Sequence, residues 1–339
     1  MEPTVPSPSK RWSRWHDRLH RQLLAEPTLL PDGTKLLLAV SGGQDSMALL
    51  ALLQDLQRLH RWELLVWHGD HGWHEGSAAI AFELKQWCEA QRQPIRLSQA
   101  SSGNTPLGKP ISEAAARTWR YGELQQLASD QGMDVVTGHT ATDRAETLLL
   151  NLARGCDLGG LGSLRPQRPL AHNQPDGPQL RRPMLCFSRQ ETLAICEELG
   201  LPIWLDPSNE TATFARNRIR QTILPVLEEL YPSSTRRMAD LAERMSHVRD
   251  IQQELATYAL EHLRLGKGLD RRRLGRLASG TRRTLLASWL HQQGVAAIDA
   301  TQLDQLSHRL AWGEPAGQCD LPGQCTLIWR DDTLLLNHL

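Results

Sequence analysis

A glycine-rich stretch near the N-terminus carries residue types that bind anions. Residues 41–46 read SGGQDS, follow the apolar run 35–40 and precede a helical pattern. Glycine lets the backbone adopt positive φ and approach a ligand closely, and the first N–H groups of a helix attract anions because they have no intrahelical partner. The stretch predicts either a capped turn or a phosphate-binding loop made of Ser41, Gly42, Gly43, Gln44, Asp45 and Ser46.

Asp45 is the unexpected member of this stretch, because a carboxylate repels phosphate oxygens. It could cap the following helix, or it could bind a Mg²⁺ ion that neutralises both the carboxylate and the phosphates. The sequence leaves both roles open. The spacing is neither that of the Gly-x-x-x-x-Gly-Lys-Ser/Thr loop nor that of Gly-x-Gly-x-x-Gly.

Alternating strand-like and helix-like segments must position this stretch. The apolar runs predict strands at 35–40, 62–67, 94–97 and 134–137. Helical spacing predicts helices at 12–24, 45–59, 77–92, 111–131, 142–153 and 188–199. Such alternation is typical of βαβ units in a parallel sheet, with right-handed crossovers and ligands bound at the carboxyl edge. We therefore expect an α/β, Rossmann-like N-terminal domain with the anion loop at that edge.

The later part of the chain changes character. Residues 155–183 are rich in Gly and Pro and predict a long loop, a feature that is usually functional or mobile. After residue 232 the pattern is mostly helical, with one or two strands expected at 325–336. We predict a catalytic domain at residues 1–225 and a mostly helical domain at residues 226–339.

Composition limits the classes of protein to consider. The 339 residues include 38 basic and 38 acidic side chains, so net charge gives no argument for a polyanionic partner. No apolar run approaches the roughly 20 residues of a membrane span, and the first residues lack the apolar core of a signal peptide. We expect a cytoplasmic protein. Its six cysteines show no C-x-x-C spacing, so we predict reduced thiols and no zinc site.

A resemblance to a known family rests on several motifs in order. SGGQDS after a strand resembles the SGGxDS loop of the N-type (PP-loop) ATP pyrophosphatases. Further segments resemble those of the tRNA(Ile)-lysidine synthetases: His71-Gly72, residues 113–121 (EAAARTWRY), residues 138–147 (GHTATDRAET), residues 151–155 (NLARG) with 159–161 (GGL), residues 182–185 (RPML), residues 206–209 (DPSN) and residues 216–220 (RNRIR). The similarity covers about residues 30–230.

The sequence departs from the family pattern at four positions. Thr140 and Thr142 stand where the family has His and Asp, Arg144 replaces a Gln, and His74 replaces a basic residue. We therefore expect that one metal or substrate ligand of the family is missing or has moved. Asp143 and Glu146 are retained.

The resemblance implies a ligase that forms a C–N bond. Such an enzyme joins free L-lysine to C2 of the wobble cytidine of tRNA(Ile) with a CAU anticodon, through an adenylated base, and releases AMP and pyrophosphate. It implies ATP and Mg²⁺ as cofactors, and we hypothesise that Asp45 and Asp143 share the Mg²⁺ ion. We predict catalytic roles for Asp45, Asp143 and Arg117, of which Arg117 would stabilise phosphate charge or the tRNA near the target base. ATP contacts are expected from residues 41–46, His71 and His139, and lysine or Mg²⁺ contacts from Asp143 and Glu146.

Arginines are the candidates for contact with tRNA. They are Arg120, Arg154, Arg216 and Arg220 in the first domain and Arg271, Arg272 and Arg273 in the second, which is expected to bind tRNA. The alternative for each is an ion pair within the fold. Two other functions stay open, namely a tRNA thiolation enzyme of the same superfamily and a non-catalytic nucleotide- or tRNA-binding module. The oligomeric state is also open, and a homodimer is among the options.

Overall fold

The computed structural model describes residues 12–70, 72, 76–100, 113–171, 174–204, 215–295 and 298–338. The chain divides into two compact units, Met1–Ser246 and His247–Leu339, and each is described by itself. Within the described residues, no helix combines the length and apolarity that crossing a bilayer requires.

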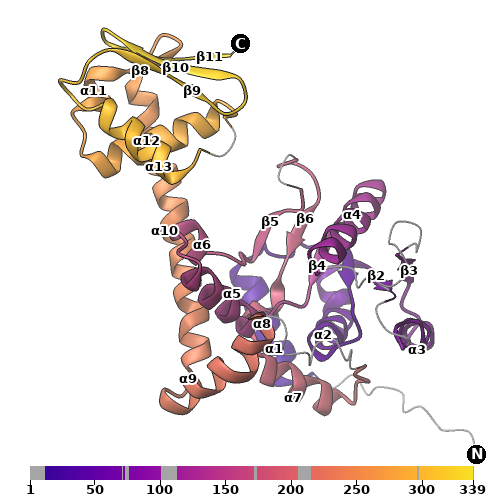
Figure 1. The fold of residues 1–339 in the computed structure, drawn as a ribbon. Helices are drawn as coiled ribbons and strands as arrows, with labels where there is room; N and C mark the ends of the chain where they lie inside the picture. The colour runs from indigo at the N-terminus through magenta and orange to yellow at the C-terminus, as the bar shows by residue number, and fades with distance from the viewer. Residues whose placement is uncertain are drawn as a thin grey trace, which may run out of the picture. The chain divides into compact units, whose positions relative to one another are not determined.

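A mostly parallel sheet forms the centre of the first unit (Figure 1). Its strand order is β3-β2-β1-β4-β6-β5, and only the β5–β6 pair is antiparallel. The strands are β1 (Lys35–Ala39), β2 (Glu63–Asp70), β3 (Ile95–Gln99), β4 (Asp134–Thr137), β5 (Gln167–Pro169) and β6 (Gln179–Arg181). The chain runs outward from β1 to β3 and then returns to the other side of β1. The switch point between β1 and β4 is where sheets of this kind bind ligands.

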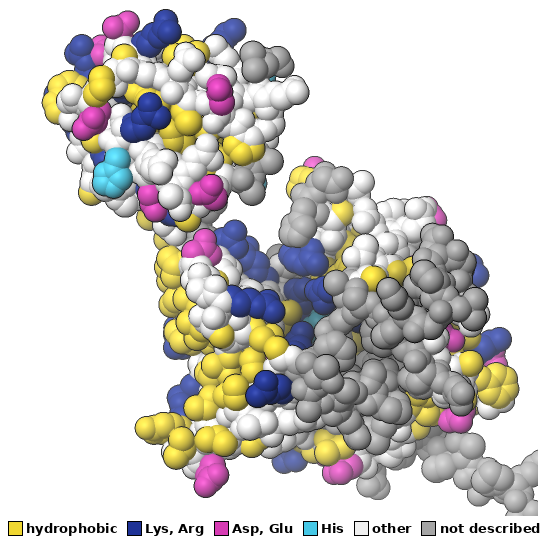
Figure 2. Space-filling view, in the orientation of Figure 1, with side chains coloured by type: hydrophobic (Ala, Val, Ile, Leu, Met, Phe, Trp, Pro, Cys, Tyr) yellow, Lys and Arg dark blue, Asp and Glu magenta, His cyan; other side chains and the backbone are white. Residues whose placement is uncertain are grey.

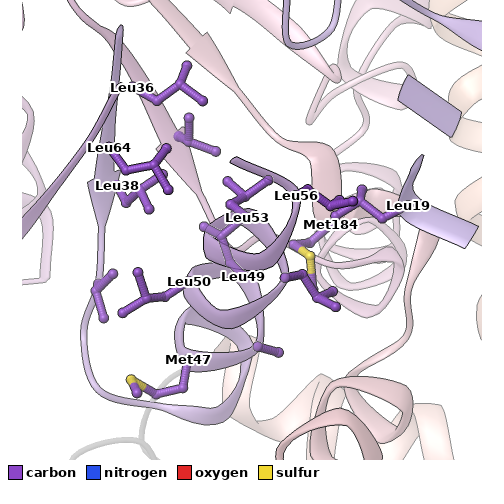
Figure 3. Close-up of a cluster of buried hydrophobic side chains, with 14 of the residues drawn as sticks. Leu19, Leu36, Leu38, Met47, Leu49, Leu50, Leu53, Leu56, Leu64 and Met184 are labelled. Carbon is purple, nitrogen blue, oxygen red and sulfur yellow. The ribbon is translucent and has the colours of Figure 1, made fainter. Parts of the chain in front are cut away.

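Helices alternate with these strands as predicted, which confirms the α/β fold class. Those between strands include α2 (Gln44–His60), α3 (Ser77–Ala90), α4 (Glu113–Gln131) and α5 (Ala141–Ala153), while α1 (Arg14–Ala25) precedes β1 and α7 (Arg189–Leu199) follows β6. Helix α2 is central, with Leu49, Leu50 and Leu53 fully buried and packed with Leu36 and Leu38 of β1 (Figure 3). Each such side chain contributes roughly 1.5–3 kcal/mol through burial, so the helix that starts at the loop is firmly anchored.

The segment expected to be a long loop contains regular structure. It holds the short helix α6 (Leu158–Leu161) and the β5–β6 hairpin, and η2 (Pro183–Cys186) follows. Leu180 is fully buried, and Arg181 Nε donates to Asp134 Oδ2 at 2.7 Å, which ties β6 to β4. Strands of three residues are too short to show periodicity, so the sequence reading missed them.

The boundary between the units lies inside a helix. The chain continues through α8 (Ala215–Arg218), η4 (Ile219–Ile223), α9 (Leu224–Leu230) and α10 (Ser234–Leu263), and the units divide at Ser246 and His247, about 20 residues after the predicted boundary. Leu224 and Met238 pack against Ala145, and Arg144 pairs with Glu243 at 3.5 Å. These contacts keep residues 226–246 with the first unit.

The second unit combines helices with a small antiparallel sheet. Its sheet has the order β7-β8-β11-β10-β9. The elements are β7 (Arg264–Leu265), β8 (Gly268–Asp270), α11 (Arg271–Gly275), α12 (Ser279–Gln292), α13 (Ala300–Arg309), β9 (Gly317–Leu321), β10 (Cys325–Arg330) and β11 (Thr333–His338). The strands expected at 325–336 are β10 and β11, around a core that includes Leu286, Leu327 and Trp329.

Candidate functional site

The two segments predicted to carry the chemistry meet at the switch point of the sheet. The loop after β1 and the turn after β4 are in tight contact, because a Cβ atom on Gly138 would lie 2.8 Å from the carbonyl oxygen of Asp45. Only glycine allows this approach. The fold thereby brings residues 41–46 beside residues 139–146.

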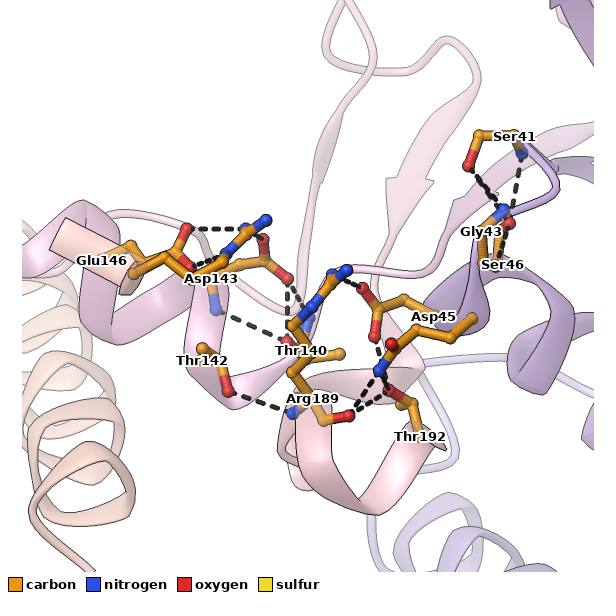
Figure 4. Close-up of polar contacts among 12 residues, drawn as sticks. Ser41, Gly43, Asp45, Ser46, Thr140, Thr142, Asp143, Glu146, Arg189 and Thr192 are labelled. Atoms are coloured by element: carbon orange, nitrogen blue, oxygen red, sulfur yellow. Dashed lines mark hydrogen bonds and ion pairs between the residues drawn. The ribbon is translucent and has the colours of Figure 1, made fainter. Parts of the chain in front are cut away.

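The SGGQDS loop closes on itself through its serines (Figure 4). Ser46 Oγ accepts from Ser41 N at 3.2 Å and donates to Gly43 O at 2.9 Å. Gly42 has a φ of 90°, which favours glycine. Gly43 is the N-cap of α2 and provides no side-chain cap, so the first N–H groups of α2 retain their capacity for an anion.

Asp45 is not the cap of α2, which settles one of its two open roles. Its carboxylate instead accepts from Arg189 Nη1 and Thr192 Oγ1 of α7, each at 2.5 Å. Burial raises its pKa to about 6, and the negative charge of Asp143 adds to this effect, while Arg189 and Thr192 oppose it. A buried carboxylate that remains hard to ionise beside an arginine is a site where a further cation is favourable.

Gln44 joins the loop to the same helix. Its amide donates to Arg189 O at 2.6 Å and to Thr192 Oγ1 at 3.1 Å, so its side chain turns toward α7. The sequence reading missed Arg189 and Thr192. The Ser188–Glu191 capping box indicates where α7 begins, but no local sequence pattern predicts that Arg189 pairs with Asp45.

The threonines that depart from the family pattern both have structural partners. Thr140 caps α5 in a capping box, in which Asp143 Oδ2 accepts from the backbone N–H and the hydroxyl of Thr140, both at 2.8 Å. Thr142 Oγ1 accepts from the backbone N–H of Arg189 at 3.0 Å. Thr142 therefore links α5 to α7, the helix whose Arg189 and Thr192 contact Asp45. It does so at the position where the family has a carboxylate.

Asp143 and Glu146 form a buried charge cluster with two of the predicted tRNA arginines. Glu146 is fully buried, and its two oxygens accept from Arg216 Nε at 2.7 Å and Arg220 Nε at 2.5 Å. Asp143 pairs with the same arginines at 3.0 and 3.5 Å. Burial opposes the charge of Asp143, yet His139 and the arginines hold its pKa below the ordinary range. Both oxygens of Glu146 therefore accept hydrogen bonds from the two arginines.

Cations surround His139 at the start of α5. Its Nδ1 lies 2.7 Å from Thr137 Oγ1. Burial lowers its pKa well below the usual range, and Arg182, Arg216 and Arg117 act in the same direction against Asp143, so the ring is neutral at pH 7. In Figure 2, basic side chains and a histidine gather where the first unit is hollowed beside the β5–β6 hairpin.

Arg182 and Arg117 belong to this basic cluster. Burial lowers the pKa of Arg182 to about 10, and its buried Nε has no hydrogen-bond partner among the described residues. Arg117 is exposed on α4, with its guanidinium 4.8 Å from the centre of the Tyr121 ring. An unsatisfied buried guanidinium N–H is a place where an anionic ligand is expected.

The remaining predicted arginines are spread along the chain. Arg120 is half-buried on α4, and Arg154 is exposed at the end of α5. The arginines at 271–273 lie on α11 of the second unit, where they bind carbonyl oxygens of Glu314 and Pro315 and the carboxylates of Asp332 and Asp270. His71, His74 and residues 206–209 lie outside the described residues.

The end of β2 is rich in histidine, a residue type that can bind metal ions. His68 is buried, and its Nδ1 lies 2.8 Å from the Val40 carbonyl oxygen. Burial lowers its pKa, so its ring is neutral and holds β2 to the end of β1. Among the residues that the structure describes, no group of three or more His, Cys, Asp or Glu could hold a metal ion.

Comparisons with known proteins place the chain in a family. A PP-loop domain model matches residues 16–227. The chain is 61% identical to the tRNA(Ile)-lysidine synthase of Parasynechococcus marenigrum over 96% of its own length and 95% of that protein. It is 43% identical to the tRNA(Ile)-lysidine synthase of Prochlorococcus marinus (strain SARG), over 96% and 97% of the two chains.

A solved structure shares the fold at low sequence identity. The U34-tRNA thiolase NcsA of Methanococcus maripaludis, solved with its [4Fe-4S] cluster, is 18% identical and superposes with a TM-score of 0.58, over 69% of this chain and 79% of that one. The similarity extends to the fold alone. The match to the domain model and the identity with full-length relatives decide the family: the chain belongs to the PP-loop family and, within it, to the tRNA(Ile)-lysidine synthases.

Proposed function

We propose that this protein ligates L-lysine to C2 of the wobble cytidine in a tRNA(Ile) with a CAU anticodon, using ATP. The observation that carries the proposal is the contact between the SGGQDS loop and the β4–α5 turn, because it unites an anion-binding loop with Asp45, Asp143 and His139. The names of the similar full-length proteins support the same reaction.

ATP would bind with its phosphates at the loop. The N–H groups at the start of α2 and the hydroxyls of Ser41 and Ser46 supply hydrogen-bond donors. Arg182 offers a buried N–H for which the described residues provide no partner, and the positive charge of exposed Arg117 is near enough to help lower the pKa of His139. Donors that are already in place before the ligand binds are a main source of electrostatic stabilisation in enzymes.

Asp45 and Asp143 are the residues that would hold Mg²⁺. The donor set fits this role, because the charge of Asp143 reaches Asp45 and raises its pKa, and a shared cation would favour the ionised form of both carboxylates. Their hard carboxylate oxygens suit Mg²⁺, which proteins usually bind through one or two carboxylates together with substrate phosphates. When bound, the ion would neutralise phosphate charge.

The chemistry has two steps. The cytosine O2 attacks the α-phosphorus of ATP and pyrophosphate leaves, which gives an adenylated base. The ε-nitrogen of lysine then attacks C2, the C2–O bond breaks, AMP leaves, and the nitrogen gives up a proton. The arginines around His139 stabilise the negative charge that develops on phosphate, and positioning of both substrates supplies much of the remaining rate.

We assign tRNA contacts to the basic hollow of the first unit and, within the second unit, to residues 271–273. The target base lies in an anticodon loop, where bases can be unstacked and read at their edges. Since Glu146 holds Arg216 and Arg220 in place, we assign these two arginines to the wall of the reaction site. We place the reaction in the cytoplasm, and we leave the oligomeric state, a homodimer included, to experiment.

The cysteines give little support to the thiolation alternative. Burial raises the pKa of Cys88, Cys186 and Cys196 to about 12, so these thiols are poor nucleophiles at neutral pH. No pair of cysteines has C-x-x-C spacing. Lysine ligation therefore accounts for the site better.

The test is incubation of the protein with ATP, labelled L-lysine and total tRNA. We expect the label at the wobble position of one isoleucine tRNA and one pyrophosphate released for each lysine incorporated. Pyrophosphate release without lysine uptake would point to another ligase or to a thiolase. Binding of ATP without any turnover would support the non-catalytic module.

A further inference from the structure

Trp204, which lies outside the family motifs, contacts the phosphate-binding loop. The backbone N–H of Trp204 donates to the carbonyl oxygen of Gly42 at 3.0 Å. Its ring lies against the same glycine, because a Cβ atom on Gly42 would be 3.3 Å from Trp204 Cε3. The indole N–H donates to Glu83 Oε2 of α3 at 2.7 Å. Trp204 thus links the loop to α3.

The geometry of the peptide bond gives this contact a consequence for the anion site. The Gly42–Gly43 peptide is planar and trans, so its C=O and N–H point in opposite directions. With the C=O held by Trp204, the Gly43 N–H is directed to the other side, where it lies 3.4 Å from Ser41 Oγ. That side carries the two serine hydroxyls of the loop.

Gly42 has the freedom that makes such a constraint necessary. Its φ of 90° lies in the region that glycine populates readily, so the adjoining peptides could rotate if nothing held them. A rotation would turn the Gly43 N–H away from the phosphate. The ring of Trp204, together with Ile80, whose Cγ2 would lie 3.5 Å from a Cβ on Gly42, limits that movement.

We propose that Trp204 is a positioning residue that fixes the phosphate-binding loop in its anion-receiving shape. The proposal rests on the proposed function, since the ligand is taken to be ATP. Trp204 does not touch the reacting atoms; it acts through Gly42. Its loss should therefore weaken ATP binding while leaving lysine binding and the rate at saturating ATP nearly unchanged.

The experiment measures ATP affinity by equilibrium dialysis without tRNA, and then KM and kcat in the ligation assay. Trp204→Ala keeps the backbone N–H that holds Gly42 O, but it removes the ring that lies against Gly42 and the indole bond to Glu83. Because the loss of the ring frees the loop, this variant should raise Kd and KM for ATP about tenfold, which corresponds to roughly 1.4 kcal/mol. Trp204→Phe keeps a ring against Gly42 and should recover most of the affinity. KM for lysine should not change.

A second indole–carboxylate pair provides the matched control. Trp15 Nε1 of α1 donates to Glu198 Oε2 of α7, also at 2.7 Å, so Trp15→Phe removes an equivalent bond in the same unit. We expect Trp15→Phe to lower Tm without changing Kd for ATP. An equal loss of ATP affinity in Trp15→Phe, or normal affinity in Trp204→Ala, would overturn the proposal.

A double-mutant cycle tests the contact itself. Gly42→Ala should weaken ATP binding in both backgrounds because of its φ, but less in the Trp204→Ala background, where the methyl group no longer meets the ring. Additive effects would contradict a direct ring contact. If the wild-type protein itself failed to bind ATP, the proposed function would fail first, and this outcome is distinct from a failure that appears only in the variants.

Discussion

The buried carboxylate of Asp45 should destabilise the substrate-free protein at neutral pH. Burial and the charge of Asp143 raise its pKa from 3.8 to about 6. At about 1.4 kcal/mol for each pKa unit, keeping this group ionised in the folded state costs about 3 kcal/mol. Replacing Asp45 by Asn removes that cost, so the variant should be more stable than the wild type at pH 7.

The sign of the pH dependence follows from the direction of the shift. Because the folded state binds the proton of Asp45 more tightly than the unfolded state, the associated stability is present below about pH 4 and is lost as the pH rises through 6. The increase in the free energy of unfolding that Asp45→Asn produces over the wild type should therefore be near zero at pH 4 and reach at most about 3 kcal/mol above pH 7. The variant also loses the ion pair between Asp45 and Arg189. Because the Arg189 side chain is 35% exposed, this loss offsets less than about 1 kcal/mol of the gain.

The assay is urea unfolding of the nucleotide-free protein between pH 5 and 8, followed by circular dichroism. Asp17→Asn serves as the control, because Asp17 forms an exposed ion pair with Arg21 and its loss should change the free energy of unfolding by less than about 1 kcal/mol. In the ligation assay Asp45→Asn should lose most pyrophosphate release. A difference in stability that does not grow between pH 5 and 7 would refute the reasoning.

Three further changes test other parts of the site. Thr140→Ala removes the cap of α5 and should cost about 1 kcal/mol of unfolding free energy; Thr140→Ser should restore it, and a Ser variant as weak as Ala would argue against the cap. Glu146→Gln removes one of the two carboxylates that face Arg216 and Arg220 and should lower the free energy of unfolding by about 3 kcal/mol. Urea titration measures this change, and a variant as stable as the wild type would contradict the expectation. Changing all three arginines at 271–273 to Ala should reduce the slope of the logarithm of the tRNA association constant against the logarithm of salt concentration, by about one for each phosphate that is no longer bound. An unchanged slope would mean that these arginines bind only their partners within the fold and not tRNA.

Much of the first unit could be predicted because its signals are local. Helix α2 and strand β4 follow from apolar runs and caps within a few residues of each other, and β4 lies where the sequence placed it, at Asp134–Thr137. The β5–β6 hairpin could not be found in the same way, because its strands are three residues long and are held by a distant partner, Asp134.

The sequence alone determined the loop, its glycines and the order of the elements, since these depend on backbone conformation and spacing along the chain. It also contained the T-x-x-D spacing of the capping box at Thr140 and Asp143. Only the tertiary structure decided the partners of Asp45. Arg189 and Thr192 stand 144 and 147 residues away in the chain, and they reach the carboxylate because α7 packs on α2. An ion pair of that separation is a property of packing, which no local pattern encodes.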